Sequence, residues 1–174
     1  MDRQNTACFV VAILALSAQT IDSALYDISI DSFEPYSGTD PSFIDYGTLR
    51  VSKKSRNLFV IDGQFEFFEN MDDDTRCVFQ INLGDNSQPV MSGNSGFCEA
   101  MDVDGKVMET LRQLSNLPGK GDCPFPKGKY HIDKYELNQS QLPPMVPPGK
   151  YTLEVQMVQN DKIKGGYKLR VTIK

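Results

Sequence analysis

The 174-residue chain contains no tryptophan and only one histidine, His131. His131 lies between Tyr130 and Ile132, and no second imidazole exists to complete a metal site. We interpret His131 as an outward-facing strand residue rather than a general base, because nothing in the sequence supplies its partners. Neither a Ser-His-Asp nor a Cys-His arrangement can be assembled. We therefore expect no enzymatic activity, no cofactor and no metal.

The chain also lacks internal repeats, low-complexity tracts and the basic footprint of a nucleic-acid-binding protein, and its net charge is -5. Apolar residues make up 40% of the sequence, which is enough to build a core and argues against disorder. The length fits one domain with some residues to spare at the front.

Long apolar runs are absent except at the start, where Ala7 to Ala18 forms a mostly apolar run of twelve residues. Small residues follow it. This pattern is typical of a secretory signal peptide, which we assign to residues 1–23 with cleavage somewhere in 17–24. A membrane anchor would need roughly 20 apolar residues. We expect residues 24–174 to form a single secreted, extracellular domain, with lysosomal delivery as the less favoured destination.

Few cysteines remain after this cleavage, because Cys8 leaves with the signal peptide. Cys77, Cys98 and Cys123 form an odd set in an oxidising compartment, so one disulfide and one free thiol is the simplest monomer. Cys98 and Cys123 flank one coherent segment at loop-like positions, whereas Cys77 lies in a strand-like run and is expected to be a buried thiol. Asn138 begins an N-glycosylation sequon, whose occupancy the sequence does not decide.

Most of the remaining chain alternates between apolar and polar residues, which is typical of antiparallel strands with one wet face. The alternating segments are residues 26–30, 49–51, 59–67, 77–83, 151–157 and 167–173. Turn residues occur at 37–41, 71–74, 84–87, 148–149 and 164–166. Further strands are expected to begin at Gly128 and Gly149. This spacing predicts an all-β antiparallel sandwich or cup.

One region has helical periodicity instead. Between Cys98 and Leu117, apolar residues recur at spacings of three, four and seven; they are Met101, Val107, Met108, Leu111 and Leu114. Asp102 or Asp104 is placed to cap the start of this helix. We expect one short helix across or beside the opening of the cup.

The loop from Leu142 to Pro148 combines three apolar side chains with four prolines. Proline removes backbone donors and fixes φ, so this loop is stiff and cannot extend a sheet. Two interpretations remain open. The loop is either an exposed apolar rim of a binding site or a plug folded into the core. The same choice applies to the apolar face of the expected helix.

The C-terminal half of the chain contains a distinctive set of residues: Phe97-Cys98-Glu99, Cys123-Pro124-Phe125, Gly128, Tyr130, Leu142-Pro143, Gly149 and Tyr151. With this set it resembles the family of the lysosomal ganglioside activator protein. The opening at residues 27–30 and the low cysteine count are closer to the insect CheB-like secreted chemosensory group. Both groups are similar in shape to the ML lipid-recognition domains.

This resemblance implies an antiparallel β-cup with an apolar cavity for acyl chains, and it also implies a disulfide between Cys98 and Cys123. The activator has additional disulfides that this chain lacks, so a glycolipid-presenting role is not carried over. We expect a non-enzymatic carrier of a hydrophobic small molecule or lipid, with chemosensory physiology and a receptor as its setting. The alternatives are an activator that extracts lipid at a membrane surface for a hydrolase, and an interaction module with a filled core.

The expected site divides into a cavity and its rim. The cavity residues are Phe59, Phe65, Phe67, Phe79, Leu153 and Val155. The rim residues are Met101, Met108, Leu111, Leu142, Met145 and Val146.

Overall fold

The computed structural model describes residues 26–84, 86 and 88–174. The expected signal peptide, its cleavage region and Cys8 lie outside the described residues. The fold is all-β, as predicted, and consists of two antiparallel sheets with short helices beside them. Among the described residues, no helix combines the length and the apolar composition needed to cross a bilayer.

The regular elements follow one another in a simple order along the chain. They are β1 (Ile28–Pro35), β2 (Ile44–Asp45), β3 (Arg50–Ser55), β4 (Leu58–Phe67), β5 (Arg76–Leu83), β6 (Met91–Gly96), α2 (Phe97–Met101), α3 (Lys106–Gln113), β7 (Gly128–Tyr135), the 3-10 turn η1 (Gln139–Gln141), β8 (Gly149–Gln159) and β9 (Lys162–Ile173). The strands expected to begin at Gly128 and Gly149 do begin there.

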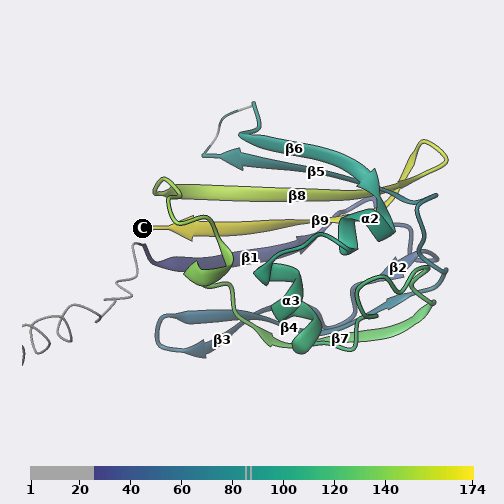
Figure 1. The fold of residues 1–174 in the computed structure, drawn as a ribbon, viewed down its shortest axis with the longest axis horizontal. Coiled ribbons are helices and arrows are strands. Elements are labelled where there is room, and N and C mark those ends of the chain that lie inside the picture. The colour runs from purple at the N-terminus through teal and green to yellow at the C-terminus, as the bar shows by residue number, and fades with distance from the viewer. Residues whose placement is uncertain (1–25, 85, 87) are drawn as a thin grey trace, which may run out of the picture.

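The larger sheet has five strands in the order β1-β9-β8-β5-β6, so the first and last strands of the described residues are neighbours. In the second sheet, β4 pairs with β2, β3 and β7. Figure 1 shows the five strands in the upper part of the molecule and β3, β4 and β7 below them. The helices lie in front of the strands in that view.

The hairpin between β8 and β9 turns at Asn160 and Asp161, whose φ angles are 50° and 58°. Asparagine and aspartate tolerate this left-handed region better than most residues. The turn predicted at 164–166 is wrong, because these residues belong to β9. At Gly166, with φ 159°, a Cβ would lie 2.4 Å from the carbonyl oxygen of Val155. Glycine is therefore needed at this position because the backbone of β8 lies too close for a side chain, and not because the chain turns here.

The single predicted helix is broken into α2 and α3. Gly105 precedes α3 as its N-cap with φ 153°, a conformation that glycine adopts without a steric penalty. The prediction that Asp102 or Asp104 caps the helix start is wrong, because α3 has no side-chain cap and Asp102 follows α2 as its C-cap.

Helix α2 takes its cap from a distant part of the chain. The Oδ1 atom of Asp73 accepts hydrogen bonds from the backbone N–H groups of Cys98 at 2.9 Å and Glu99 at 3.3 Å. A carboxylate here satisfies the free donors of the first turn and matches the helix dipole. Asp73 thereby joins the turn before β5 to the segment after β6.

A packed core occupies the space between the sheets near α2. Its buried members are Phe43, Ile44, Phe67, Met71, Cys77, Phe97, Phe125, Tyr130 and Met157. The predicted disulfide between Cys98 and Cys123 is confirmed. Beside it, Met71 and Phe125 exchange two backbone hydrogen bonds of 2.8 Å. A second, smaller cluster of Tyr26, Val171 and Ile173 lies near the two ends of the described chain.

Candidate functional site

The register of the larger sheet aligns apolar side chains across its inner face. Residues directly opposite each other on antiparallel strands point to the same side of the sheet. Cys77 on β5 is opposite Met157 on β8, which is in turn opposite Gly165 on β9. Cys77 and Met157 belong to the packed core, so this row identifies the inner face.

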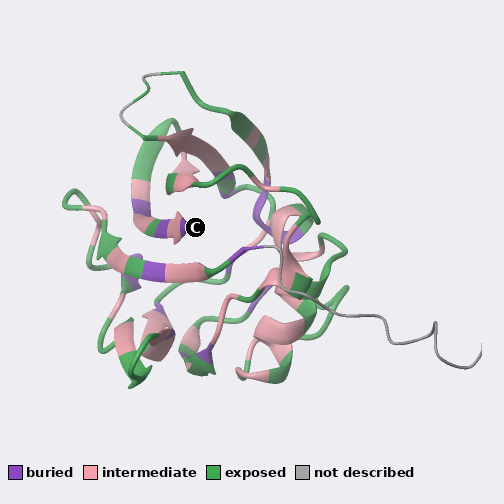
Figure 2. Ribbon diagram, turned by 90° about the vertical axis from the view of Figure 1, so that its left-hand side faces the viewer, coloured by how far each residue is buried: buried purple, intermediate pink, exposed green. Residues whose placement is uncertain are grey.

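The next two rows along the same face are apolar and only half-buried. We call them the apolar strip, which consists of Phe79, Val155 and Tyr167 in one row and Ile81, Leu153 and Leu169 in the next. Figure 2 shows intermediate burial along much of the strands, with fully buried segments at intervals. Inward-facing residues of a closed sandwich are mostly buried, so the strip leaves apolar surface within reach of solvent or a ligand.

The apolar strip has a packed boundary at each end. The core containing Cys77 closes one end. At the other end, Leu142 and Val146 pack against the cluster of Tyr26, Val171 and Ile173. The hydroxyl of Tyr26 donates to the carbonyl of Pro143 at 2.6 Å and fastens the proline loop there.

The proline loop therefore combines features of both interpretations. Leu142 and Val146 fold inward, as a plug would, whereas the side chain of Met145 is 86% exposed. A methionine at a loop tip is flexible and suits irregular apolar partners.

The expected cavity residues of β4 separate into two environments. Phe67 is buried in the packed core, and Phe65 packs beside it with its ring 5.5 Å from that of Phe67. Phe59 is half-buried, while its neighbour Val60 is only 1% exposed. The strand has a register shift with β7 beside Gly63. The structure thus gathers Phe79, Leu153 and Val155 into one strip and places Phe67 in the core.

The expected rim residues of the helical segment also separate. Met101 on α2 packs against the core, whereas Met108 and Leu111 on α3 are half-buried. Helix α3 is strongly amphipathic, yet none of its residues is fully buried. It packs against β7 and η1. A surface helix normally buries its apolar stripe against the core, so α3 retains apolar surface that the described residues do not cover.

Arg112 holds the helical segment together. Its guanidinium donates to the carbonyl oxygens of Pro118 at 3.2 Å and Met101 at 2.6 Å. It also forms an ion pair of 3.3 Å with Asp102. Since one side chain ties the end of α2 to the segment after α3, this arginine helps to fix the position of α3.

Sequence reasoning missed the contribution of β9 and β1 to the site. Tyr167 lies in the strip, and the ring of Phe33 on β1 is 5.3 Å from it and 5.8 Å from Tyr46. Burial raises the pKa of Tyr167 and of Tyr135 to about 12, so both hydroxyls stay protonated at neutral pH. The alternation of β9 showed which of its residues share a face, but only the pairing with β8 places that face beside Leu153 and Val155.

Cys77 is a buried free thiol, as the sequence predicted. Burial, with a smaller effect from the Asp73 carboxylate, raises the pKa of its thiol to about 11. We expect iodoacetamide at about pH 8 to label Cys77 at least ~100-fold more slowly in the folded protein than in guanidinium without reductant, because the thiolate is the reactive form. Peptide mass spectrometry measures both rates. Equal rates would contradict the enclosed position of this thiol.

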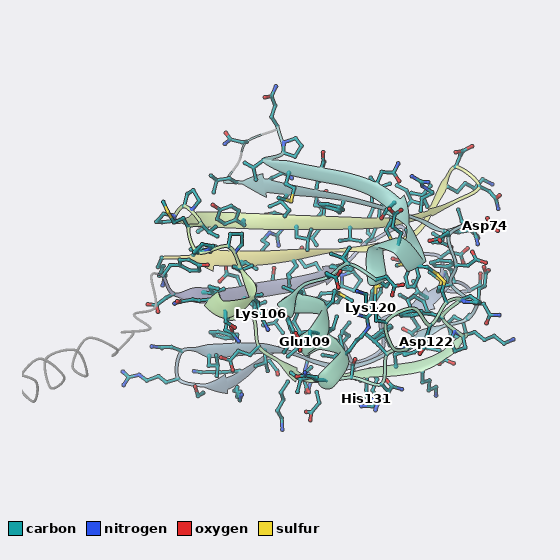
Figure 3. The ribbon with its side chains drawn as sticks, viewed as in Figure 1. Asp74, Lys106, Glu109, Lys120, Asp122 and His131 are labelled. Carbon is teal, nitrogen blue, oxygen red and sulfur yellow. A yellow bond between two sulfur atoms is a disulfide. The ribbon has the colours of Figure 1, made fainter. Side chains whose placement is uncertain are left out.

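The polar residues of the outer surface include His131 and the charged residues of α3. Figure 3 labels Lys106 and Glu109 on α3 and His131 on β7. Within residues 26–84, 86 and 88–174, no group of three or more His, Cys, Asp or Glu side chains could hold a metal ion. The backbone N–H of His131 donates to Asn116 at 2.7 Å, and its side chain is exposed.

Two hollows occur at the surface, and neither is lined by an expected cavity residue. One, of about 500 Å³, lies at the loop before β6 and is lined by Asn86, Gln88, Pro89 and Val90. The other, of about 390 Å³, lies between the start of α3 and Lys120. The first is lined by two polar and two apolar residues and the second mostly by charged and polar ones, so neither has the predominantly apolar lining of a typical site for a hydrophobic ligand.

The sequon residue Asn138 is exposed at the start of η1. Its Oδ1 atom accepts hydrogen bonds from the backbone N–H of Ser140 at 3.0 Å and from its hydroxyl at 2.7 Å. The amide nitrogen of this exposed residue is the atom to which the modification would attach.

Comparison with known proteins gives one partial similarity. Residues 75–153 match the model of a family described as "Protein of unknown function (DUF1091)", which is less than half of the 174-residue chain. The matching segment includes β5 to β7, both helices and the disulfide. No curated protein matches the chain. The similarity therefore identifies a segment and assigns no activity to it.

Proposed function

We propose that the chain is a secreted, non-enzymatic carrier that holds a hydrophobic ligand against the apolar strip. The ligand class is a lipid, a fatty-acid derivative or a cuticular hydrocarbon acting as a pheromone. The single observation that carries this proposal is the half-buried state of six aligned inner-face residues, Phe79, Val155, Tyr167, Ile81, Leu153 and Leu169. The resemblance to activator-like and CheB-like proteins agrees with this class of ligand.

The energetics of such binding need no polar network. Each buried methylene contributes about 0.8 kcal/mol, and micromolar affinity corresponds to about -8 kcal/mol. A long acyl chain therefore supplies enough apolar surface even after the free-energy cost of lost translational, rotational and conformational freedom is subtracted. The half-buried apolar stripe of α3 is a second surface that such a chain could cover.

Delipidated protein is expected to bind a fluorescent long-chain fatty acid with micromolar affinity, measured by fluorescence titration. Leu153→Gln places a polar amide in the centre of the strip and should weaken binding roughly 10–100-fold. Thr152→Gln is the matched control, because it also introduces glutamine into β8, but at the preceding residue, whose side chain lies on the opposite face of the strand. It should leave the affinity unchanged.

The titration also separates the rival functions. If neither a fatty acid nor a long-chain hydrocarbon binds, the carrier proposal fails and a filled interaction module is favoured. If both variants lose binding equally, the ligand does not occupy the strip.

A second candidate function is extraction of lipid from membranes, and the exposed Met145 at the tip of the proline loop favours it. Lys120, Lys127 and Lys129 are exposed and would contact anionic headgroups. Transfer of fluorescent lipid from anionic vesicles that is faster than from neutral vesicles would support this role over simple carriage.

A further inference from the structure

Strand β6 is the outermost strand of the larger sheet and has a neighbour on one side only. It pairs with β5 from Met91 to Gly96 without a register shift. Figure 1 shows it at the upper edge of the molecule with no strand or helix beyond it. Met91, Ser92 and Asn94 are exposed. The edge therefore presents backbone groups that no described element pairs with.

The direction of these backbone groups follows from one hydrogen bond. The N–H of Phe97 donates to the carbonyl of Thr75 at 2.9 Å. Hydrogen-bonded and non-hydrogen-bonded pairs alternate along an antiparallel ladder, so the pair of Phe79 and Gly93 is also of the bonded kind. Ser92 and Asn94 fall between such pairs, and their N–H and C=O groups point away from β5.

The other strand edges of the molecule carry features that oppose further pairing. Lys54 sits in a register shift of β3. Lys134 of β7 has φ 49° and interrupts the ladder with β4. Asp31 sits in a register shift of β1. Charges and bulges of this kind are common protections of edge strands. Strand β6 has the sequence MSGNSG, with no charged residue, no proline and no bulge.

We propose that β6 pairs antiparallel with β6 of a second copy of this chain, around a two-fold axis through Gly93. In this register Ser92 lies opposite the partner's Asn94, and each such pair exchanges two backbone hydrogen bonds. The two copies of Gly93 form the close, non-bonded pair at about 4.5 Å between Cα atoms. The two larger sheets then join into one continuous sheet.

A second copy fits this edge in charge and in apolar surface. The chain has a net charge of -5, yet the six residues of β6 carry no charge that would repel another copy. The positive charge of Arg76, on the neighbouring strand β5, is bound to Asn94 of its own chain at 2.8 and 3.0 Å. At the start of the edge lie Val90 and Met91, which are 57% and 58% exposed. In the two-fold pairing, the second copy would cover these two residues of the first copy, and the first copy would cover those of the second.

Sedimentation velocity of the purified chain tests the proposal. We expect a concentration-dependent monomer–dimer equilibrium below about 1 mM. Ser92→Pro removes only the backbone N–H of this residue, which points away from β5. The variant should raise the dissociation constant of the dimer roughly 10–100-fold, because each copy loses the hydrogen bond that its residue 92 donates to the other copy. Ser92→Ala keeps that N–H and should dimerise like the unaltered chain. A monomer at every concentration, or a dimer unaffected by Ser92→Pro, would overturn the proposal.

Amide hydrogen exchange gives a readout that does not depend on the proline variant folding. The N–H groups of Ser92 and Asn94 should exchange rapidly in dilute protein and become protected as the concentration rises. Amides of β3 should show no such change and serve as the internal control. Rapid exchange of Ser92 and Asn94 at high concentration would also overturn the pairing. The result does not depend on whether a ligand is carried.

Discussion

Phe67→Ala is expected to lower the free energy of unfolding by about 3–5 kcal/mol, the range found when a buried phenylalanine is truncated. The ring is 5% exposed and meets the rings of Phe97 at 5.8 Å and Tyr130 at 5.7 Å. A domain of this size is stable by about 5–15 kcal/mol, so the variant should lie close to the limit of folding. Urea unfolding followed by circular dichroism measures the change.

The adjacent residue supplies a matched control for this substitution. Phe68 is 41% exposed, so Phe68→Ala removes the same number of atoms from a solvent-exposed position. We expect it to change the free energy of unfolding by less than about 1 kcal/mol. Similar losses in both variants would show that the core near α2 is not packed as described.

Removal of the disulfide is the second change with a large expected effect. Cys98 and Cys123 are separated by 25 residues. The chain-entropy model assigns about 3–4 kcal/mol to a cross-link of this length. The double variant Cys98→Ala/Cys123→Ala should therefore unfold at a markedly lower urea concentration than the unaltered protein.

Cys77→Ala is the control for the disulfide variant, because it removes a buried sulfur without removing a cross-link. We expect a loss of about 1 kcal/mol for it, which is the scale of a small cavity. If the double variant were no less stable than Cys77→Ala, the cross-link would contribute little beyond the packing of its sulfur atoms.

The strands that could be predicted from the sequence are those whose side chains alternate. Residues 77–83 and 151–157 carry this alternation, and both lie within strands of the structure. Strand β6 was not predicted, because its sequence MSGNSG shows no alternation of apolar and polar side chains. Its conformation comes from the ladder with β5, which is tertiary information that the local sequence does not contain.

The candidate site was predictable in part for a related reason. Alternation places Phe79, Leu153 and Val155 on the apolar faces of their strands. It does not say which strands are neighbours, so Tyr167 and Leu169 could not be joined to them before the register was known. Likewise, a periodic apolar residue such as Phe67 can face either a packed core or open space. Only the burial of its neighbours separates these two environments.

The position of β9 has a consequence for how the protein is made. Strand β9 (Lys162–Ile173) lies between β8 and β1, although β1 (Ile28–Pro35) is far from it in the sequence. During synthesis β1 emerges long before β9, so the larger sheet can close only after β9 has been made. Strand pairings between residues far apart in the sequence form slowly, and the apolar faces of the unpaired strands stay exposed until they form. Newly made chains are therefore expected to depend on chaperones until the last strand is in place.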